Sequence, residues 1–339
     1  GEQLLAWLNQ YTFPTERKFK DPDYAREIAA IFLNELLRNG TTTALVFAAV
    51  YPQSATVLFE AAAARNLRMI AGKVMMDRNA PDDLCDTAES SYQDSKALIE
   101  AWHRRGRLLY AVTPRFAVTS TPAQLAAAKR LLTEYPDVYL HTHLSENVDE
   151  VAAVQALFPN CSGYLDVYDQ AGLVKNTSIF AHGVQLTEAE FSRLSEAEAA
   201  IAFCPTSNLF LGSGLFKIEA AKRRDRPVKV GLGTDIGAGT SFSMLQTTNE
   251  AYKIAQLRRQ KLSPFQALYL ATLGGAEALN LATQLGSFEP GKEADFVVIN
   301  PQSTPLLTLR NPTPTAPDLK ALSVLFFGLE FLGVDRAID

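Results

Sequence analysis

Short apolar runs alternate with longer amphipathic stretches along most of the chain. The short runs predict buried parallel strands at 42–47, 68–74, 108–113, 138–143, 177–182, 199–204 and 228–235. The stretches between and after them have the apolar spacing of helices, near 23–39, 54–65, 86–105, 121–135, 148–157, 187–196, 215–222, 242–258, 263–273 and 275–281. Residues 286–299 predict a turn-rich entry into a further strand, and the proline-rich stretch from 301 predicts a loop that lasts until an element at 319–332. This alternation favours a parallel sheet whose strands are joined by right-handed helical crossovers.

Polar residues at the strand ends decide between two sheet architectures. Arg115, His143, Glu146, His182 and Asp235 lie at or just beyond the C-terminal ends of predicted strands. An open doubly wound sheet gathers its ligand at one switch point, whereas a closed barrel gathers residues from many strand ends onto one face. We therefore predict an α/β fold, a (β/α)8 TIM-type barrel with seven strands present. The missing first strand is expected upstream of Gly1.

Composition and charge narrow the class of protein. The chain has 339 residues, of which 47% are hydrophobic and 20% charged, which favours one large domain or one domain with a small appendage. The net charge of −5 gives no basic surface for nucleic acid, and no apolar run is long enough for a membrane span. Three widely spaced cysteines, without a Cys-x-x-Cys motif, argue against a disulfide framework and a thiolate zinc site. We therefore expect a cytoplasmic protein that binds neither nucleic acid nor membranes.

The segment 140–146 combines metal-binding and proton-transfer side chains. His141 and His143 are two apart on a strand, so they point to the same face, and Glu146 follows just past the strand end. Such an arrangement suits a metal-bound water and its proton shuttle. Two half-buried histidines and a loop glutamate would give the same pattern, and His182, at another strand end, could equally be structural.

Two further strand ends carry candidate ligands. Asp235 follows the end of an apolar strand, where a carboxylate needs a cation or hydrogen bonds. The nearby glycines lack the spacing of a dinucleotide-binding site. Arg115 either ties down a loop through a salt bridge or offers paired donors to a ring carbonyl and ring nitrogen, with Phe116 stacking on a flat ring. Asn208 either shapes the pocket or makes a turn, and we favour the turn.

Together these motifs resemble those of guanine deaminases in the metal-dependent amidohydrolase superfamily, over essentially the whole chain. The segments that carry the resemblance are 38–43, 113–116, 141–146, 180–182, 204–208, 233–235 and 290–296. The resemblance implies an amidohydrolase-type barrel over 1–285. It also implies that 286–339 returns toward a small β-sandwich, of which the chain holds a remnant.

The resemblance also implies roles for individual residues. His143 and Asp235 would ligate one zinc ion, with iron as the alternative metal. Glu146 would move protons to and from the ring, Asp235 would accept a proton from the attacking water, and His182 would stabilise the developing charge. Arg115 and Phe116 would hold the purine, which the other four residues also contact. The expected reaction is the conversion of guanine to xanthine and ammonia, in a homodimer, while His141 only packs inward.

One expected feature has no counterpart in the sequence. The family's first metal-binding pair, a His-x-His at the end of the first strand, is expected upstream of Gly1. Without it the remaining ligands are expected to bind zinc weakly, because such sites usually take three or four protein donors. We therefore expect the parent protein to deaminate guanine and the chain as given to be inactive. The alternatives are a deaminase or hydrolase of cytosine, a triazine or an adenosine-like ring, and a non-catalytic barrel module.

Overall fold

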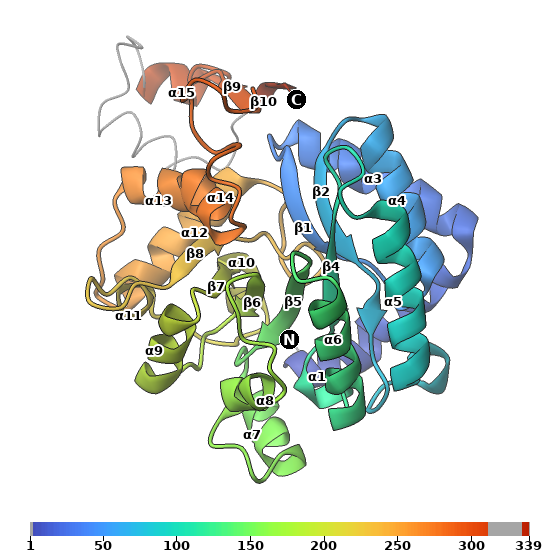
Figure 1. Cartoon of the computed structure of the whole chain (residues 1–339). Coiled ribbons are helices and arrows are strands. Elements are labelled where there is room, and N and C mark those ends of the chain that lie inside the picture. Colours follow the sequence, from blue (N-terminus) through green and yellow to red (C-terminus); the bar gives the residue numbers. More distant parts are fainter. Residues whose placement is uncertain (1–2, 311–333, 339) are drawn as a thin grey trace.

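The computed structural model describes residues 3–310 and 334–338 (Figure 1). Its centre is a parallel sheet in the order β1-β2-β4-β5-β6-β7-β8, with β3 also paired to β4. The strands are β1 (Thr43–Phe47), β2 (Arg68–Gly72), β3 (Val74–Met75), β4 (Leu109–Pro114), β5 (Tyr139–Leu144), β6 (Ser178–His182), β7 (Ala200–Phe203) and β8 (Lys229–Leu232). All seven predicted strands are confirmed, and β8 ends three residues before Asp235.

The sheet curls, and its helices lie on the outside (Figure 1). The edges of the sheet are β1 and β8, and no pairing joins them in the part of the chain that the structure describes. A TIM-type barrel that lacks one strand has this form, so the predicted fold class is confirmed. The predicted helices are α3 (Pro22–Arg38), α4 (Pro52–Ala64), α5 (Ala88–Trp102), α6 (Pro122–Glu134), α7 (Val148–Leu157), α9 (Glu188–Glu196), α11 (Ile218–Ala221), α12 (Met244–Leu257), α13 (Pro264–Ala271) and α14 (Leu273–Ala278).

Residues 4–20 fold into four short helical turns across the C-terminal ends of the strands. They are α1 (Leu4–Trp7), η1 (Leu8–Thr12), α2 (Phe13–Glu16) and η2 (Arg17–Lys20). Glu16 pairs with Arg115, after β4, and Arg17 pairs with Asp83, after β3. Gln3 accepts a hydrogen bond from Asn147, after β5. The segment Leu4–Lys20 therefore covers the rim at which the predicted site residues lie.

The opposite end of the sheet's interior is filled with apolar side chains. Residues of α14 and the turn after it pack against inward-facing strand residues, and together they form a cluster of Ile70, Ala111, Tyr139, Ile179, Ala200, Ala276, Ala278, Leu281 and Leu285. A Cβ on Gly231 would lie 2.9 Å from the Cα of Gly275, so β8 and α14 approach closely only because both residues are glycine.

The C-terminal segment forms a small antiparallel pair of strands. The predicted strand entry is confirmed as β9 (Phe296–Ile299), which pairs with β10 (Val334–Ile338). Arg107, before β4, pairs with Glu293 and Asp295 at 2.6 and 2.5 Å, which fastens this segment to the barrel. The expected loop after Pro301 was partly wrong, because α15 (Pro305–Arg310) begins there with a proline in its first turn, where proline fits a helix. The expected element at 319–332 lies outside the described residues, and the division at 285 stays a prediction.

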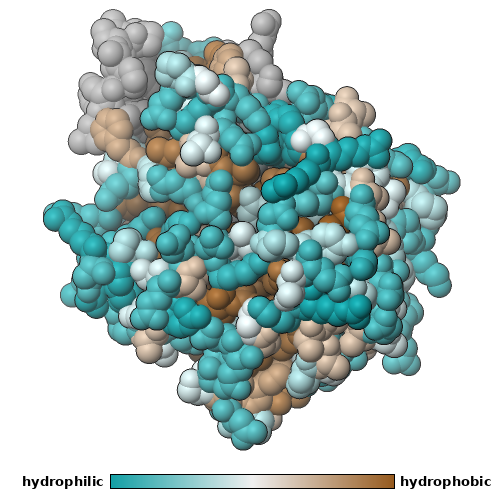
Figure 2. Space-filling model, in the orientation of Figure 1, coloured by the Kyte–Doolittle hydropathy of each residue, from teal (hydrophilic) through white to brown (hydrophobic). Residues whose placement is uncertain are grey.

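Polar side chains lie mainly at the surface and apolar side chains mainly inside, as in an ordinary globular protein. Figure 2 shows hydrophilic residues over most of the visible face, with apolar residues mainly in recesses between them. Within residues 3–310 and 334–338, no helix has both the length and the apolar character needed to cross a membrane.

Candidate active site

The ends of β5 and β6 bring three of the predicted site residues together. The two strands pair in register, with Leu144 beside His182. The rings of His143 and His182 are stacked with their centroids 5.3 Å apart. Glu146, just past β5, places Oε2 3.4 Å from Nε2 of His182. The predicted convergence of these side chains at one rim is therefore present.

Left-handed backbone conformations occur at the strand ends that carry these residues. The φ angles are 48° at Ser145, 74° at His182 and 48° at Asp235. For residues other than glycine this conformation costs on the order of 1 kcal/mol or more, and it persists where surrounding contacts enforce it. Such strain gathers at functional sites.

One ring nitrogen of His143 is hydrogen-bonded to the backbone, and the other can bind a metal ion. Its Nδ1 lies 2.7 Å from the backbone oxygen of Arg115. A carbonyl oxygen can only accept, so Nδ1 carries the proton and Nε2 keeps a lone pair. Burial, as the largest effect, holds the pKa of His143 well below its usual value, so the ring is neutral. A neutral imidazole oriented by a backbone carbonyl suits a metal ligand.

His182 is oriented by a residue that the sequence pattern assigned to a turn. Asn208 instead lies fully buried in α10 (Pro205–Phe210), and its Nδ2 is 2.9 Å from Nδ1 of His182. The expectation of a turn was wrong, because Pro205 starts a short helix here. With the amide nitrogen on this side, Nδ1 of His182 accepts and Nε2 carries the proton. Burial lowers the pKa of His182.

Glu146 is buried and close to changing its protonation state near neutral pH. It is 1% exposed, and its Oε1 accepts a hydrogen bond from Ser213 at 3.0 Å. Burial, and then the charge of Asp235, raise its pKa to about 8. A carboxyl group with such a pKa can both give and take a proton at neutral pH.

Asp235 lies near this cluster, although it follows β8 by three residues. It is half-buried, and its charge raises the pKa of Glu146 and opposes the lowering of the pKa of His182. Electrostatic interactions act over several ångströms in a protein interior, so Asp235 lies in the neighbourhood of Glu146 and His182. Its grouping with His143 around one metal ion stays a prediction.

Arg115 forms the salt bridge that the sequence left as one of two interpretations. Its Nη1 donates to both carboxylate oxygens of Glu16 at 2.7 and 2.9 Å. The guanidinium also lies 5.6 Å from the ring of Phe13. Phe116 is buried and meets the His143 ring edge-on, with centroids 6.2 Å apart.

His141 packs inward, as expected. It is 4% exposed, and its ring centroid lies 3.9 Å from that of Phe47. Burial, as the largest effect, lowers its pKa to about 3, so it is neutral.

The donors that this chain provides fit a zinc ion in their chemistry. The free Nε2 of His143 and the carboxylate of Asp235 are the nitrogen and oxygen ligands that zinc takes. Across residues 3–310 and 334–338, however, no three or more His, Cys, Asp or Glu side chains are grouped so as to hold a metal ion. The residues present therefore supply part of a metal site.

Glu150 holds the backbone at Glu146 through hydrogen bonds. This role was not predicted from the sequence. Its Oε2 accepts hydrogen bonds from the backbone nitrogens of Glu146 and Asn147 at 2.8 and 3.2 Å. Its Oε1 accepts one from Tyr164 of α8 (Tyr164–Gln170) at 2.8 Å. The spacing Asn147-x-x-Glu150 is a capping box and could have identified it.

Replacing Glu150 by Gln is expected to flatten the dependence of stability on pH. Burial is the largest of the effects that raise the pKa of Glu150 from 4.5 to about 7. Between these values the folded protein keeps a proton that the unfolded chain releases, so raising the pH favours unfolding. From pH 5 to 7.5 the free energy of unfolding should fall by about 1–3 kcal/mol more in the unaltered chain than in the Glu150→Gln variant. Urea unfolding at several pH values measures this, and equal slopes would contradict it.

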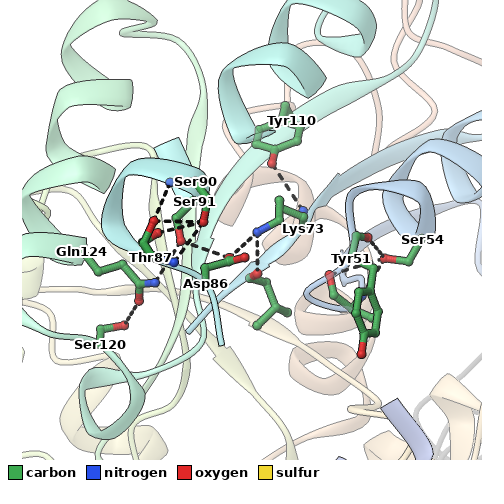
Figure 3. Close-up of polar contacts among 12 residues, drawn as sticks. Tyr51, Ser54, Lys73, Asp86, Thr87, Ser90, Ser91, Tyr110, Ser120 and Gln124 are labelled. Atoms are coloured by element: carbon green, nitrogen blue, oxygen red, sulfur yellow. Dashed lines mark hydrogen bonds and ion pairs between the residues drawn. The ribbon is translucent and has the colours of Figure 1, made fainter. Parts of the chain in front are cut away.

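A buried polar network, shown in Figure 3, joins residues 76–87, between β3 and α5, to residues 115–121, between β4 and α6. These two segments, the second of which contains Phe116, are called the wall beside Phe116. Lys73, which follows β2, is fully buried, and its ammonium group pairs with Asp86 and donates to the backbone oxygen of Val74. Asp86 accepts from Ser91 at 3.0 Å. Gln124 then links Ser91 to Ser120. The network ties the segment after β3 to α5 and α6.

The same wall is joined directly to the Arg115 loop. The backbone nitrogen of Arg115 donates to Met75 at 3.1 Å. Asp77 accepts from the backbone nitrogen of Thr121 at 2.7 Å. The Lys73–Asp86 pair therefore supports the wall at Phe116 without reaching the site itself.

Comparison with known proteins agrees with this geometry. The model of the amidohydrolase family matches residues 2–328. A guanine deaminase from Escherichia coli (strain K12) is 61% identical over 338 residues, which cover 100% of this chain and 75% of that protein. The solved structure of E. coli guanine deaminase has a TM-score of 0.94 at 58% identity, covering 99% of this chain and 79% of that one.

Two other solved structures hold relevant ligands. Guanine deaminase from C. acetobutylicum, with bound guanine in the active site, has a TM-score of 0.88 at 30% identity, covering 99% of this chain and 81% of that one. An adenosine deaminase from Xanthomonas campestris with bound zinc has a TM-score of 0.84 at 26% identity, covering 99% and 73%. The chain therefore belongs to the amidohydrolase family, and the relatives most similar to it in this comparison are guanine deaminases.

Proposed function

We propose that this chain carries the machinery for hydrolytic deamination of guanine to xanthine and ammonia. The full-length similarity to guanine deaminases is the observation that carries the substrate assignment. The neighbour with bound guanine supports it further. Other amino-heterocycles are less well supported, because the zinc-bound adenosine deaminase is much less similar.

The chemistry of the site fits this reaction. Deamination adds a water oxygen to C2 of guanine and releases the amino group as ammonia. A zinc ion held by His143 and Asp235 would supply an activated water. Glu146, protonated at neutral pH because of its raised pKa, would donate its proton to N3 and would regain one from the new C2 hydroxyl as that group becomes the carbonyl. Asp235 would accept a proton from the water and pass it to the leaving amine.

His182 and Arg115 complete the proposed roles. The Nε2 proton of His182 points to the region of Glu146 and would stabilise the oxygen that gains charge at C2. Arg115 would donate to the ring carbonyl, with Phe116 beside the ring. The homodimer, the cytoplasmic location and the choice of zinc over iron stay predictions.

A substrate panel tests the function. Ammonia release by the parent protein is measured with guanine, cytosine, adenosine and an aminotriazine, together with the metal content of the same protein. Guanine should be the preferred substrate. Zinc-loaded protein that releases ammonia from none of these compounds would contradict the proposed enzyme.

In the parent protein, replacing Arg115 by Ala is expected to raise KM for guanine about tenfold and to change kcat much less. The variant loses a charged hydrogen bond to the substrate, and such bonds contribute about 1.5–3 kcal/mol. Arg193→Ala is a matched control, since Arg193 pairs with Asp169 away from the site. Steady-state kinetics measure both variants. An unchanged KM in Arg115→Ala would return Arg115 to a purely structural role.

A further inference from the structure

Glu16 is the side chain that holds the Arg115 guanidinium in place. Both carboxylate oxygens accept from Nη1 of Arg115, at 2.7 and 2.9 Å. The Arg115 side chain is 10% exposed and that of Glu16 is 17% exposed, so little solvent screens the pair. Phe13, on the same short helix α2, is buried and lies beside the guanidinium.

The backbone of Arg115 is fixed as firmly as its guanidinium. Its nitrogen donates to Met75, and its oxygen accepts from the backbone nitrogen of His143 at 3.1 Å and from Thr142 Oγ1 at 3.2 Å. A long arginine side chain normally loses about 1.5–2 kcal/mol of conformational entropy when it is immobilised. Here that cost is met before a ligand binds, because Glu16 holds the far end of the side chain.

The pair with Glu16 leaves part of the guanidinium for a second acceptor. Only Nη1 is used, and in the described part of the chain neither Nη2 nor Nε has a hydrogen bond to a protein group. Arg115 is also next to the site, because its backbone oxygen lies 2.7 Å from Nδ1 of His143. A planar guanidinium fixed on one side presents its remaining donors in one direction.

We infer that Glu16 is a positioning residue that sets the preference for purines with an oxygen at C6. Glu16 orients Arg115 so that its remaining donors face the C6 oxygen, which distinguishes guanine and xanthine from purines without that oxygen. The inference rests on the proposed function, since it needs a purine ring beside Arg115. It gives the segment Leu4–Lys20 a part in substrate recognition in addition to its packing.

A binding comparison tests the inference without relying on turnover. Affinities for xanthine and for 2-hydroxypurine, which lacks the C6 oxygen, are measured by calorimetry for the unaltered chain, Glu16→Ala and Glu16→Gln. Glu16→Ala should weaken xanthine binding about tenfold, as expected for a charge-assisted hydrogen bond, and 2-hydroxypurine binding less than about twofold. Glu16→Gln keeps the shape and one acceptor, so it should weaken xanthine binding by an intermediate factor.

The control is a carboxylate in a similar ion pair elsewhere. Asp169 accepts from Arg193 at 2.7 and 2.8 Å, and Asp169→Ala should leave both affinities unchanged. Thermal unfolding checks that each variant is folded, and Glu16→Gln alone decides the outcome if Glu16→Ala does not fold. If the Glu16 variants lose the same affinity for both purines, or lose none, the proposed role of Glu16 is wrong. The proposed function would not be affected by that result. An unaltered chain that binds neither purine would contradict the proposed function itself.

Discussion

In the parent protein, replacing Glu146 by Gln is expected to lower the rate of guanine deamination about a thousandfold to ten-thousandfold. The amide keeps the shape of the side chain but cannot exchange a proton with the ring, and general acid–base groups contribute about this much. The raised pKa of about 8 makes Glu146 suited to this exchange at neutral pH. The loss should fall on kcat, because the purine is held by other residues. Single-turnover and steady-state assays measure it.

The metal content of Glu146→Gln decides how its loss of activity is interpreted. Elemental analysis should find as much zinc in Glu146→Gln as in the parent, because Glu146 is expected to move protons only. If zinc falls together with activity, Glu146 is a metal ligand and its proposed role is wrong. Glu60→Gln, at an exposed position of α4, serves as the control and should keep the parent rate.

Removing the carboxylate of Asp86 is expected to destabilise the fold by about 3–5 kcal/mol. Asp86→Ala leaves the Lys73 ammonium fully buried and without its counter-ion, which costs far more than the intact pair contributes. Urea unfolding should show a lower midpoint with an unchanged slope. Because the pair supports the wall beside Phe116, guanine binding should also weaken.

A double replacement separates the lost charge pair from lost packing. Lys73→Met combined with Asp86→Leu removes both charges and keeps apolar volume, so it should recover most of the stability lost in Asp86→Ala. A cost below about 1 kcal/mol for Asp86→Ala alone would show that Lys73 reaches water or another partner. The double variant could also regain full stability and still bind purine more weakly. That result would show that the ion pair sets the geometry of the wall.

The elements that the sequence predicted well are those with a strong local signal. The buried strands β5 and β6 are apolar runs that end in His143 and His182, so both the strands and their site residues could be recognised. The helices α8 and α10 were missed because they are seven and six residues long, too short for a periodic pattern. The proline at 305 was taken as a loop signal, although it begins α15.

The supporting residues of the site could not be found in the same way. Glu16 lies 99 residues from Arg115, and Asn208 lies 26 from His182. Their pairing depends on how distant segments meet at the rim, and no spacing along one strand or helix encodes it. Glu150 is the exception, because its role in a helix cap leaves a local motif.

The short turns of Leu4–Lys20 have a kinetic consequence. Glu146 and His182 are each 1% exposed beneath the covered rim, and the other end of the sheet's interior is filled by the α14 cluster. We expect the covering residues to move aside before a purine reaches the buried Glu146 and His182. The association rate of the purine should be governed by that opening motion and fall well below the diffusion limit.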